Sequence, residues 1–163
     1  MVERKRQPAL NKRRAARFAA VQALYQAEAG DLSIDRVIAE FKAHRLASIF
    51  EPLDLATPSP KVDEVWFAVI AGGAWQARDQ LDPAIESCLG ENWTLARCGY
   101  LLRATLRAGA FELARRTDVP IKVVINEYVE LAYLFFDGNE PSLVNAVLDR
   151  LAPMLRTDPE AVL

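Results

Sequence analysis

The chain has 163 residues and a formal net charge of −2, with 52% hydrophobic and 26% charged residues. This length fits one domain, or two small helical subdomains that share a core, and we expect no second catalytic domain. The composition is typical of a folded soluble protein, which excludes disorder over most of the chain. Charges or glycines break every apolar run before it reaches a membrane-spanning length, so we expect no membrane helix, no secretory signal and a cytoplasmic location.

Side chains that commonly carry catalysis are scarce. His44 is the single histidine, and Cys88 and Cys98 are the two cysteines. They are too few for a disulfide framework or a common zinc site. The pair Gly72-Gly73 lacks the following Lys-Ser/Thr or the third glycine of nucleotide-binding loops. We therefore expect no catalytic activity, no metal and no cofactor.

The positive charge is concentrated at the start of the chain. Residues 1–17 hold seven Lys and Arg side chains and one Glu, a local charge of +6 that leaves −8 for the other 146 residues. Clustered cations next to a mildly acidic body favour binding to the phosphate backbone of a nucleic acid. A solubilising arm is the alternative reading of the same charges.

The first predicted helix covers residues 10–29, which are rich in alanine and contain no proline or glycine before Gly30. Phe18, Val21 and Tyr25 fall on one apolar stripe, while Arg13 and Arg17 lie four residues apart on one flank. We expect the helix to bury the stripe and to offer both guanidinium groups to solvent.

Three further helices are predicted in the middle of the chain. One begins after Ser33 and runs to about Phe50; a loop with three prolines follows over residues 51–60. The next begins at Pro60, with Ser59 as its N-cap, and a short one opens at Asp82-Pro83 and closes at Gly90.

The last three helices complete an all-α chain of about seven helices. A long one is predicted from a Thr94 cap past Leu113. Residues 119–125 are rich in β-branched side chains, but Pro120 suits a helix start and the apolar spacing continues for three turns. We predict a helix there, apolar around much of its circumference and thus the most buried. The final helix starts at Asn139.

Two blocks of sequence resemble the NusB family of transcription antitermination factors. Residues 13–25 combine an arginine cluster with the run Val-Gln-Ala-Leu-Tyr, as in the opening helix of that family. The second block follows the family's order and spacing. It consists of Leu102-Arg103, Phe111-Glu112-Leu113, Asp118-Val119-Pro120, residues 122–127, Val144-Asn145 and Val147-Leu148-Asp149.

The resemblance implies an all-helical domain over residues 10–156, with packed subdomains at about 10–80 and 81–156. A flexible basic arm over 1–9 and a frayed tail over 157–163 would flank it. Members of the family bind the boxA element of nascent ribosomal RNA together with NusE, a small-subunit ribosomal protein. They join a complex that keeps RNA polymerase elongating, and they have no enzymatic activity.

The resemblance and the charge pattern both select Arg13, Arg14 and Arg17 as candidate RNA-binding residues, and Lys12 belongs to the same basic cluster. Asn139 and Ser142 are candidates because the resemblance implies RNA contacts at the loop and start of the last helix. Local salt bridges are the alternative for the arginines. Arg116 and Lys122 would extend the basic surface. Tyr25 falls on the apolar stripe, which favours core packing over contact with a protein partner.

One position departs from the family. Ser142-Leu143 stands where a basic residue and a phenylalanine are usual, so a charge and an aromatic stacking surface are missing. Two other functional classes stay open: a NusB-like module of an RNA methyltransferase, which would need a cofactor-binding domain, and a helical scaffold that binds no RNA. Self-association into a homodimer is also left open.

Overall fold

The structure is a computed structural model that describes residues 11–50, 61–91 and 93–156, and every regular element in these residues is helical. The α-helices are α1 (Lys12–Ala29), α2 (Ile34–Glu40), α3 (Glu64–Ser87), α4 (Tyr100–Arg115), α5 (Ile121–Phe135) and α6 (Glu140–Leu155). Shorter turns of π- and 3-10-helix form η1 (Phe41–Arg45), η2 (Leu46–Ser48) and η4 (Leu95–Cys98). The all-α prediction is confirmed, and the described segments contain six α-helices in place of the seven predicted.

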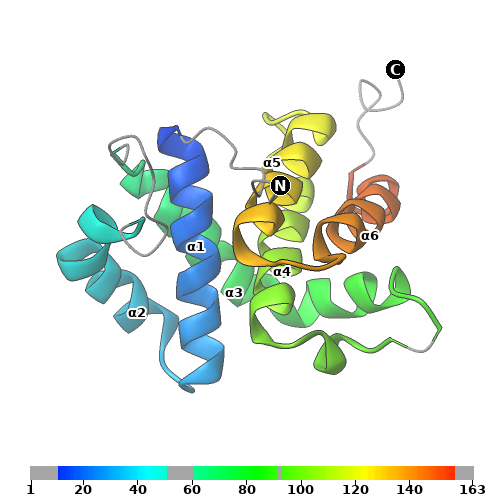
Figure 1. The fold of residues 1–163 in the computed structure, drawn as a ribbon, viewed down its shortest axis with the longest axis horizontal. Helices are drawn as coiled ribbons and strands as arrows, with labels where there is room; N and C mark the ends of the chain where they lie inside the picture. The colour runs from blue at the N-terminus through cyan, green and yellow to red at the C-terminus, as the bar shows by residue number, and fades with distance from the viewer. Residues whose placement is uncertain (1–10, 51–60, 92, 157–163) are drawn as a thin grey trace, which may run out of the picture.

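Helix α4 is the centre of the domain, and α1, α3, α5 and α6 all pack against it. Figure 1 shows α1 and α2 on one side of α4 and α6 on the other, with α5 overlapping α4 in this view. The prediction that residues 121–135 form the most buried helix is wrong: Val123 of α5 is 43% exposed, whereas every residue from Ala104 to Leu113 is buried. Hydrophobicity alone underestimates how deeply α4 is buried, because its charged residues Arg107 and Glu112 are buried with partners of opposite charge.

Helix α3 accounts for the difference in helix number. It runs through Pro83 and ends at Ser87, so no separate helix opens at Asp82. A proline inside a helix removes one backbone hydrogen bond, which favours a break. Here Leu81 and Ile85 are buried in the core, and the Asp82 carboxylate accepts two hydrogen bonds from Arg107 of α4, at 2.8 and 2.7 Å. These contacts hold the last turn of α3 in place.

Two other predicted helix starts are shifted. Helix α3 begins at Glu64, where the side chain of its N-cap Asp63 accepts the Trp66 N–H at 3.0 Å; Ser59 and Pro60 lie outside the described residues. Helix α4 begins at Tyr100 because Gly99 has φ of +77°, which separates it from η4. Thr94 is the N-cap residue of η4 but makes no side-chain cap hydrogen bond.

Small residues allow α4 to approach its neighbours closely. A Cβ atom on Gly73 of α3 would lie 2.2 Å from the Phe111 ring, and one on Gly109 of α4 would lie 2.9 Å from Leu148 of α6. The glycines therefore set the spacing between these helices.

Several predictions about the layout stay untested. The basic arm over 1–9 and the tail over 157–163 lie outside the described residues, and the subdomain boundary near residue 80 stays a prediction. Within the described segments, no helix is both long enough and apolar enough to cross a membrane.

Candidate nucleic-acid interface

The candidate site begins at the first turn of α1, which is anchored at both its cap and its backbone. The Asn11 side chain accepts the Arg14 N–H at 2.9 Å and so caps the helix. The Lys12 carbonyl accepts the Asp63 N–H at 3.2 Å, which ties the start of α1 to the start of α3. Lys12 and Arg13 are exposed on this anchored turn. Their charges are thus displayed from a fixed part of the backbone.

Trp66 organises the arginines around this turn. The guanidinium carbon of Arg13 lies 4.1 Å from the centre of its ring, and that of Arg116 lies 4.4 Å from it. Both distances suit cation–π contact. Trp66 itself is 4% exposed, so it forms a buried aromatic floor beneath the two arginines. Arg116, predicted to extend the basic surface, thus joins Arg13 although the two are distant in sequence.

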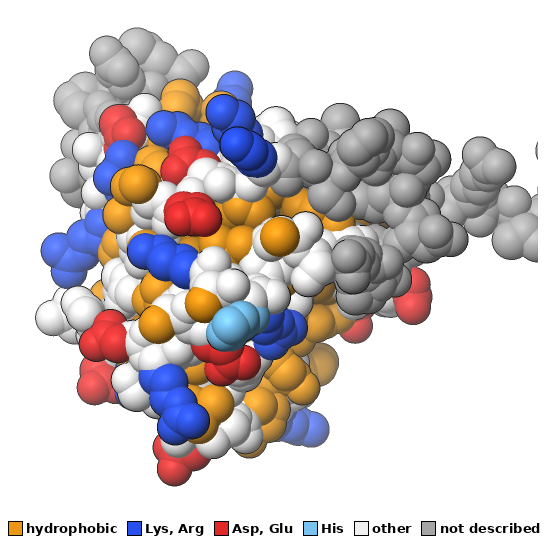
Figure 2. Space-filling model, turned by 90° about the vertical axis from the view of Figure 1, so that its left-hand side faces the viewer, with side chains coloured by type: hydrophobic (Ala, Val, Ile, Leu, Met, Phe, Trp, Pro, Cys, Tyr) orange, Lys and Arg blue, Asp and Glu red, His pale blue; other side chains and the backbone are white. Residues whose placement is uncertain are grey.

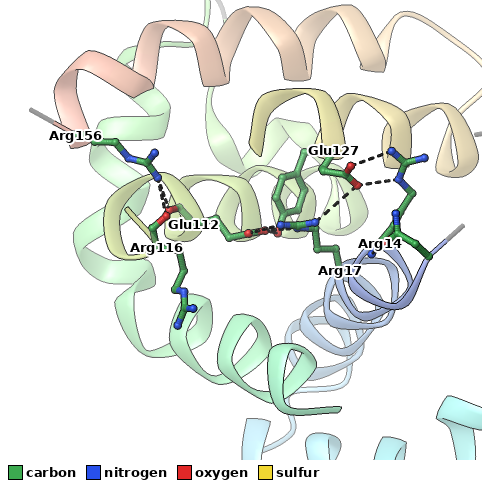
Figure 3. A network of polar contacts seen from close by, with 8 residues as sticks. Arg14, Arg17, Glu112, Arg116, Glu127 and Arg156 are labelled. Atoms are coloured by element: carbon green, nitrogen blue, oxygen red, sulfur yellow. Dashed lines mark hydrogen bonds and ion pairs between the residues drawn. The ribbon is translucent and has the colours of Figure 1, made fainter. Parts of the chain in front are cut away.

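Arg17 does not lie on the solvent-facing flank that the sequence predicts for it. It is 3% exposed, and its Nε and Nη2 atoms donate to the Glu112 carboxylate at 2.8 and 2.9 Å (Figure 3). The Tyr128 hydroxyl donates to the same carboxylate. Desolvation is the largest single effect and lowers the pKa of Arg17, but the Glu112 hydrogen bonds together with the negative charges of Glu112 and Glu127 outweigh it, and the pKa is raised. Arg17 is therefore a buried, permanently charged link between α1 and α4.

Arg14 is also engaged inside the molecule. Its Nε and Nη2 donate to the Glu127 carboxylate of α5 at 2.8 and 2.9 Å, and the Arg14 side chain is 11% exposed (Figure 3). These hydrogen bonds raise the pKa of Arg14. The salt bridges that the sequence left as an alternative for the arginine cluster are thus formed by Arg14 and Arg17.

The second candidate segment is the start of α6. Asn139 is the N-cap residue, but its side chain makes no cap hydrogen bond, and both Asn139 and Ser142 are exposed. Leu143 is half-buried beside them. The Asn139 side chain therefore does not cap α6 in this structure.

Tyr25 lies at the surface, so the core packing that its stripe position favours is wrong. It is 43% exposed, and its ring contacts that of Tyr100 edge-on at 6.3 Å. Tyr100 is 46% exposed. The two rings form an aromatic surface patch on α1 and α4, hereafter the Tyr25–Tyr100 patch.

The face formed by α2 and η1 differs from the start of α1. Figure 2 shows Lys and Arg side chains mixed with Asp and Glu on this face, to which α2 and η1 contribute the exposed Asp35, Arg36, Glu40 and Lys42. Mixed charges of this kind do not concentrate a positive potential. The exposed cations at the start of α1 are the better candidate for nucleic-acid phosphates.

Sequence reasoning missed Trp93, which lies between α3 and η4 in the chain and is 49% exposed. It also assigned no role to Arg103 of the family signature, which donates to the Leu95 carbonyl at 3.1 Å and so fixes η4 against α4. Trp93 gave a usable signal, because an indole between polar neighbours in a loop is costly unless it packs or binds. The role of Arg103 depends on tertiary contacts that no local pattern shows.

An all-helical domain with an exposed cationic helix start has the features of a small nucleic-acid-binding protein. Residues 14–153 match the NusB family, and the chain belongs to that family. It is 47% identical over 150 residues to the transcription antitermination protein NusB of Rhizobium johnstonii, covering 92% of this chain and 91% of the relative. It is 50% identical over 146 residues to the protein of the same name from Sinorhizobium fredii, covering 90% and 89%.

Solved structures share the fold. The chain is similar to T. maritima NusB, with 27% identity, a TM-score of 0.69 and coverage of 96% of this chain and 99% of that one. It also matches a chain in a crystal structure of the antitermination factors NusB and NusE in complex with dsRNA. That match has 21% identity, a TM-score of 0.67 and coverage of 88% and 97%.

Proposed function

We infer that this chain is an RNA-binding transcription antitermination factor. In this function it binds the boxA element of nascent ribosomal RNA together with NusE and supports processive elongation by RNA polymerase. The observation that carries the inference is near-50% identity, over nine-tenths of the chain, to transcription antitermination proteins named NusB. Such a factor works where transcripts are made, in the cytoplasm, and the proposal assigns it no catalytic step.

The proposed RNA surface has two parts. Lys12 and Arg13 are exposed at the start of α1 and would neutralise phosphates. Asn139 and Ser142 are exposed at the start of α6 and would supply polar contacts. Arg14 and Arg17 are ion-paired with Glu127 and Glu112, so their proposed role is to hold α1 against α4 and α5.

The Tyr25–Tyr100 patch is the proposed contact for NusE. Exposed tyrosines are enriched at protein interfaces because each ring combines apolar area with a polar hydroxyl. Tyr25→Ala should weaken NusE binding at least several-fold while leaving the fold intact, since the ring lies outside the core. Equal NusE affinity for the variant and the parent protein would remove Tyr25 from this interface.

The function is tested by measuring the affinity for a boxA-type single-stranded RNA with and without saturating NusE. An unrelated RNA of equal length is the control. Coupling between two ligands on one protein is reciprocal, so RNA should tighten NusE binding by the same factor as NusE tightens RNA binding. We expect a gain of at least several-fold. Identical RNA affinity under both conditions would contradict the adaptor mechanism and leave simple RNA binding.

The alternatives from the sequence are not favoured. The relatives named above cover about nine-tenths of both chains and are antitermination proteins, which argues against a methyltransferase module. A scaffold that binds no RNA predicts RNA affinity that is weak and independent of sequence in the same experiment. Self-association and assembly with RNA polymerase stay predictions.

A further inference from the structure

A pocket of about 430 Å³ opens between η4 and the start of α6, and the function proposed above leaves it unassigned. Its volume falls within the range of small-ligand sites in proteins. Its lining includes Trp93, Arg97, Phe136, Asn139, Glu140 and Leu143. They combine aromatic rings, a guanidinium group, an amide and a carboxylate in one concave site.

Both walls of the pocket are fixed by hydrogen bonds. On the η4 side, Arg103 donates to the carbonyls of Leu95 and Ala96 at 3.1 and 3.4 Å. On the α6 side, the Glu140 carboxylate accepts the Gly138 N–H at 3.1 Å. A pocket with walls held in this way loses little conformational freedom when a ligand enters.

We propose that this pocket receives one unpaired base of the bound RNA, stacked on Trp93. The inference rests on the proposed function and adds a specific contact to it. An indole ring 49% exposed at the pocket offers a stacking face, and stacking on aromatic side chains is how proteins commonly hold single-stranded bases. Leu143 lines the same pocket without an aromatic ring. Trp93 thus supplies the stacking surface that position 143 lacks.

The charges at the pocket fit a nucleotide. The guanidinium carbon of Arg97 lies over the Trp93 ring, 6.0 Å from its centre, which places a cation at the stacking platform. A base stacked on this indole would bring its phosphate near this cation. Asn139, already in the proposed RNA surface, lies on the pocket wall, so the pocket continues that surface.

Glu140 gives the pocket a base preference. A carboxylate accepts several hydrogen bonds, so the bond from Gly138 leaves capacity for the exocyclic amino group of a base. Acidic side chains pair in this way with the amino group of cytosine. Uracil has no exocyclic amino group and presents an oxygen instead. The pocket should therefore favour cytosine over uracil.

The test compares Trp93→Leu with the parent protein in binding to a boxA-type single-stranded RNA. Loss of one stacked base should weaken binding by about 5- to 100-fold, and Trp93→Tyr should recover much of the loss. The salt dependence should stay unchanged, because stacking neutralises no phosphate. Trp75→Leu is the matched control: Trp75 is half-buried on α3 beside Arg78 and does not line the pocket.

Two further readouts separate this role from a structural one. The indole N–H resonance of Trp93 should shift when RNA is added, and thermal unfolding of Trp93→Leu should match that of the parent. Oligocytidine should bind more tightly than oligouridine of equal length, and Glu140→Ala should remove that difference.

If the parent protein binds the RNA and the Trp93→Leu variant binds it equally well, the pocket proposal is overturned and the proposed function stands. Absence of RNA binding by the parent protein, with or without NusE, would instead overturn the proposed function and the pocket with it. A variant that loses NusE affinity but retains RNA affinity would identify the pocket as a protein-docking site and also overturn the proposal.

Discussion

Arg17 of α1 and Glu112 of α4 form a buried ion pair with two hydrogen bonds, at 2.8 and 2.9 Å. Glu112 is fully buried and also accepts the Tyr128 hydroxyl of α5, so three helices meet at one carboxylate. Part of an arginine cluster that looks like a nucleic-acid-binding sequence is therefore core structure. The separation of buried from exposed arginines decides how variants in this segment should behave.

Arg17→Ala should destabilise the fold by about 3–5 kcal/mol, because it leaves the buried Glu112 carboxylate without its cationic partner. Arg13→Ala should change stability by less than about 1 kcal/mol, since Arg13 is exposed and contacts the Trp66 ring from the surface. Urea unfolding of both variants at neutral pH measures the difference. Similar stabilities for the two variants would contradict the structural role of the Arg17–Glu112 pair.

Replacement of both Lys12 and Arg13 with Ala should weaken RNA binding without loss of helicity. If each side chain neutralises one phosphate, the salt dependence of binding should fall by about 1.4, from roughly 0.7 for each single-strand contact. The control is the double variant Arg36→Ala, Lys42→Ala, which removes two exposed charges from the α2 and η1 face. A control that lowers the slope as much as the test variant would show that the effect is one of net charge and not of position.

Local patterns predict most of the helices because capping residues and apolar spacing act over a few residues. Asn139 and Ser33 occupy the predicted N-cap positions, and Pro120 directly precedes α5. The continuation of α3 through Pro83 was not predictable in this way. It depends on the ion pair between Asp82 and Arg107, which lie in different helices.

The candidate site shows the same division. Charge counting identifies the cationic start of α1, but it cannot show which arginines are buried, because Glu112 and Glu127 are far away in sequence. The apolar stripe likewise predicts Tyr25 in the core, but only the part of the stripe that neighbouring helices cover is buried, and Tyr25 lies outside that part. Whether a charged side chain is buried or an aromatic ring is exposed depends on which other helix packs against it.

Alanine substitutions at two adjacent glycines of α3 should change the stability of the fold in opposite directions. A Cβ atom on Gly72 would lie 3.7 Å from Ile38, an ordinary contact, so Gly72→Ala should stabilise by up to about 1 kcal/mol through helix propensity. A Cβ atom on Gly73 would lie 2.2 Å from the Phe111 ring and would push α3 and α4 apart. Gly73→Ala should cost about 1–3 kcal/mol. Chemical unfolding of the two variants side by side gives the signs, and a stabilised Gly73→Ala protein would contradict the close approach.

Acid should weaken the contact between α1 and α4 through Glu28. Burial is the largest single effect and raises the pKa of Glu28, but the hydrogen bonds and positive charges of Arg103 and Arg107 together outweigh it, and the pKa lies below its ordinary value of 4.5. The contribution to stability is therefore fully present above about pH 4.5 and is lost as the pH falls through the lower folded-state pKa.

Glu28→Gln should accordingly cost about 1–3 kcal/mol at pH 7, with a smaller difference from the parent below pH 4. Urea unfolding at a series of pH values measures this difference. Asp79→Asn, at an exposed position of α3, is the control for loss of a negative charge. A stability difference for Glu28→Gln that stays constant from pH 7 to pH 3 would show that the carboxylate charge is not responsible.

Restoring a phenylalanine at position 143 should be tolerated by the fold. Leu143 is half-buried and lines the pocket of about 430 Å³ beside η4, so a larger ring can extend into open space. We expect Leu143→Phe to change stability by less than about 1 kcal/mol and to tighten RNA binding by about 1 kcal/mol, through a second aromatic face for a base. Leu148→Phe is the matched control, because Leu148 is fully buried against Gly109 and overpacking there should cost about 1–3 kcal/mol. Thermal unfolding and RNA affinity measured on the same two proteins separate an effect on folding stability from an effect on RNA binding. If Leu143→Phe loses as much stability as Leu148→Phe and gains no RNA affinity, the start of α6 is a packing element and the RNA surface proposed there is wrong.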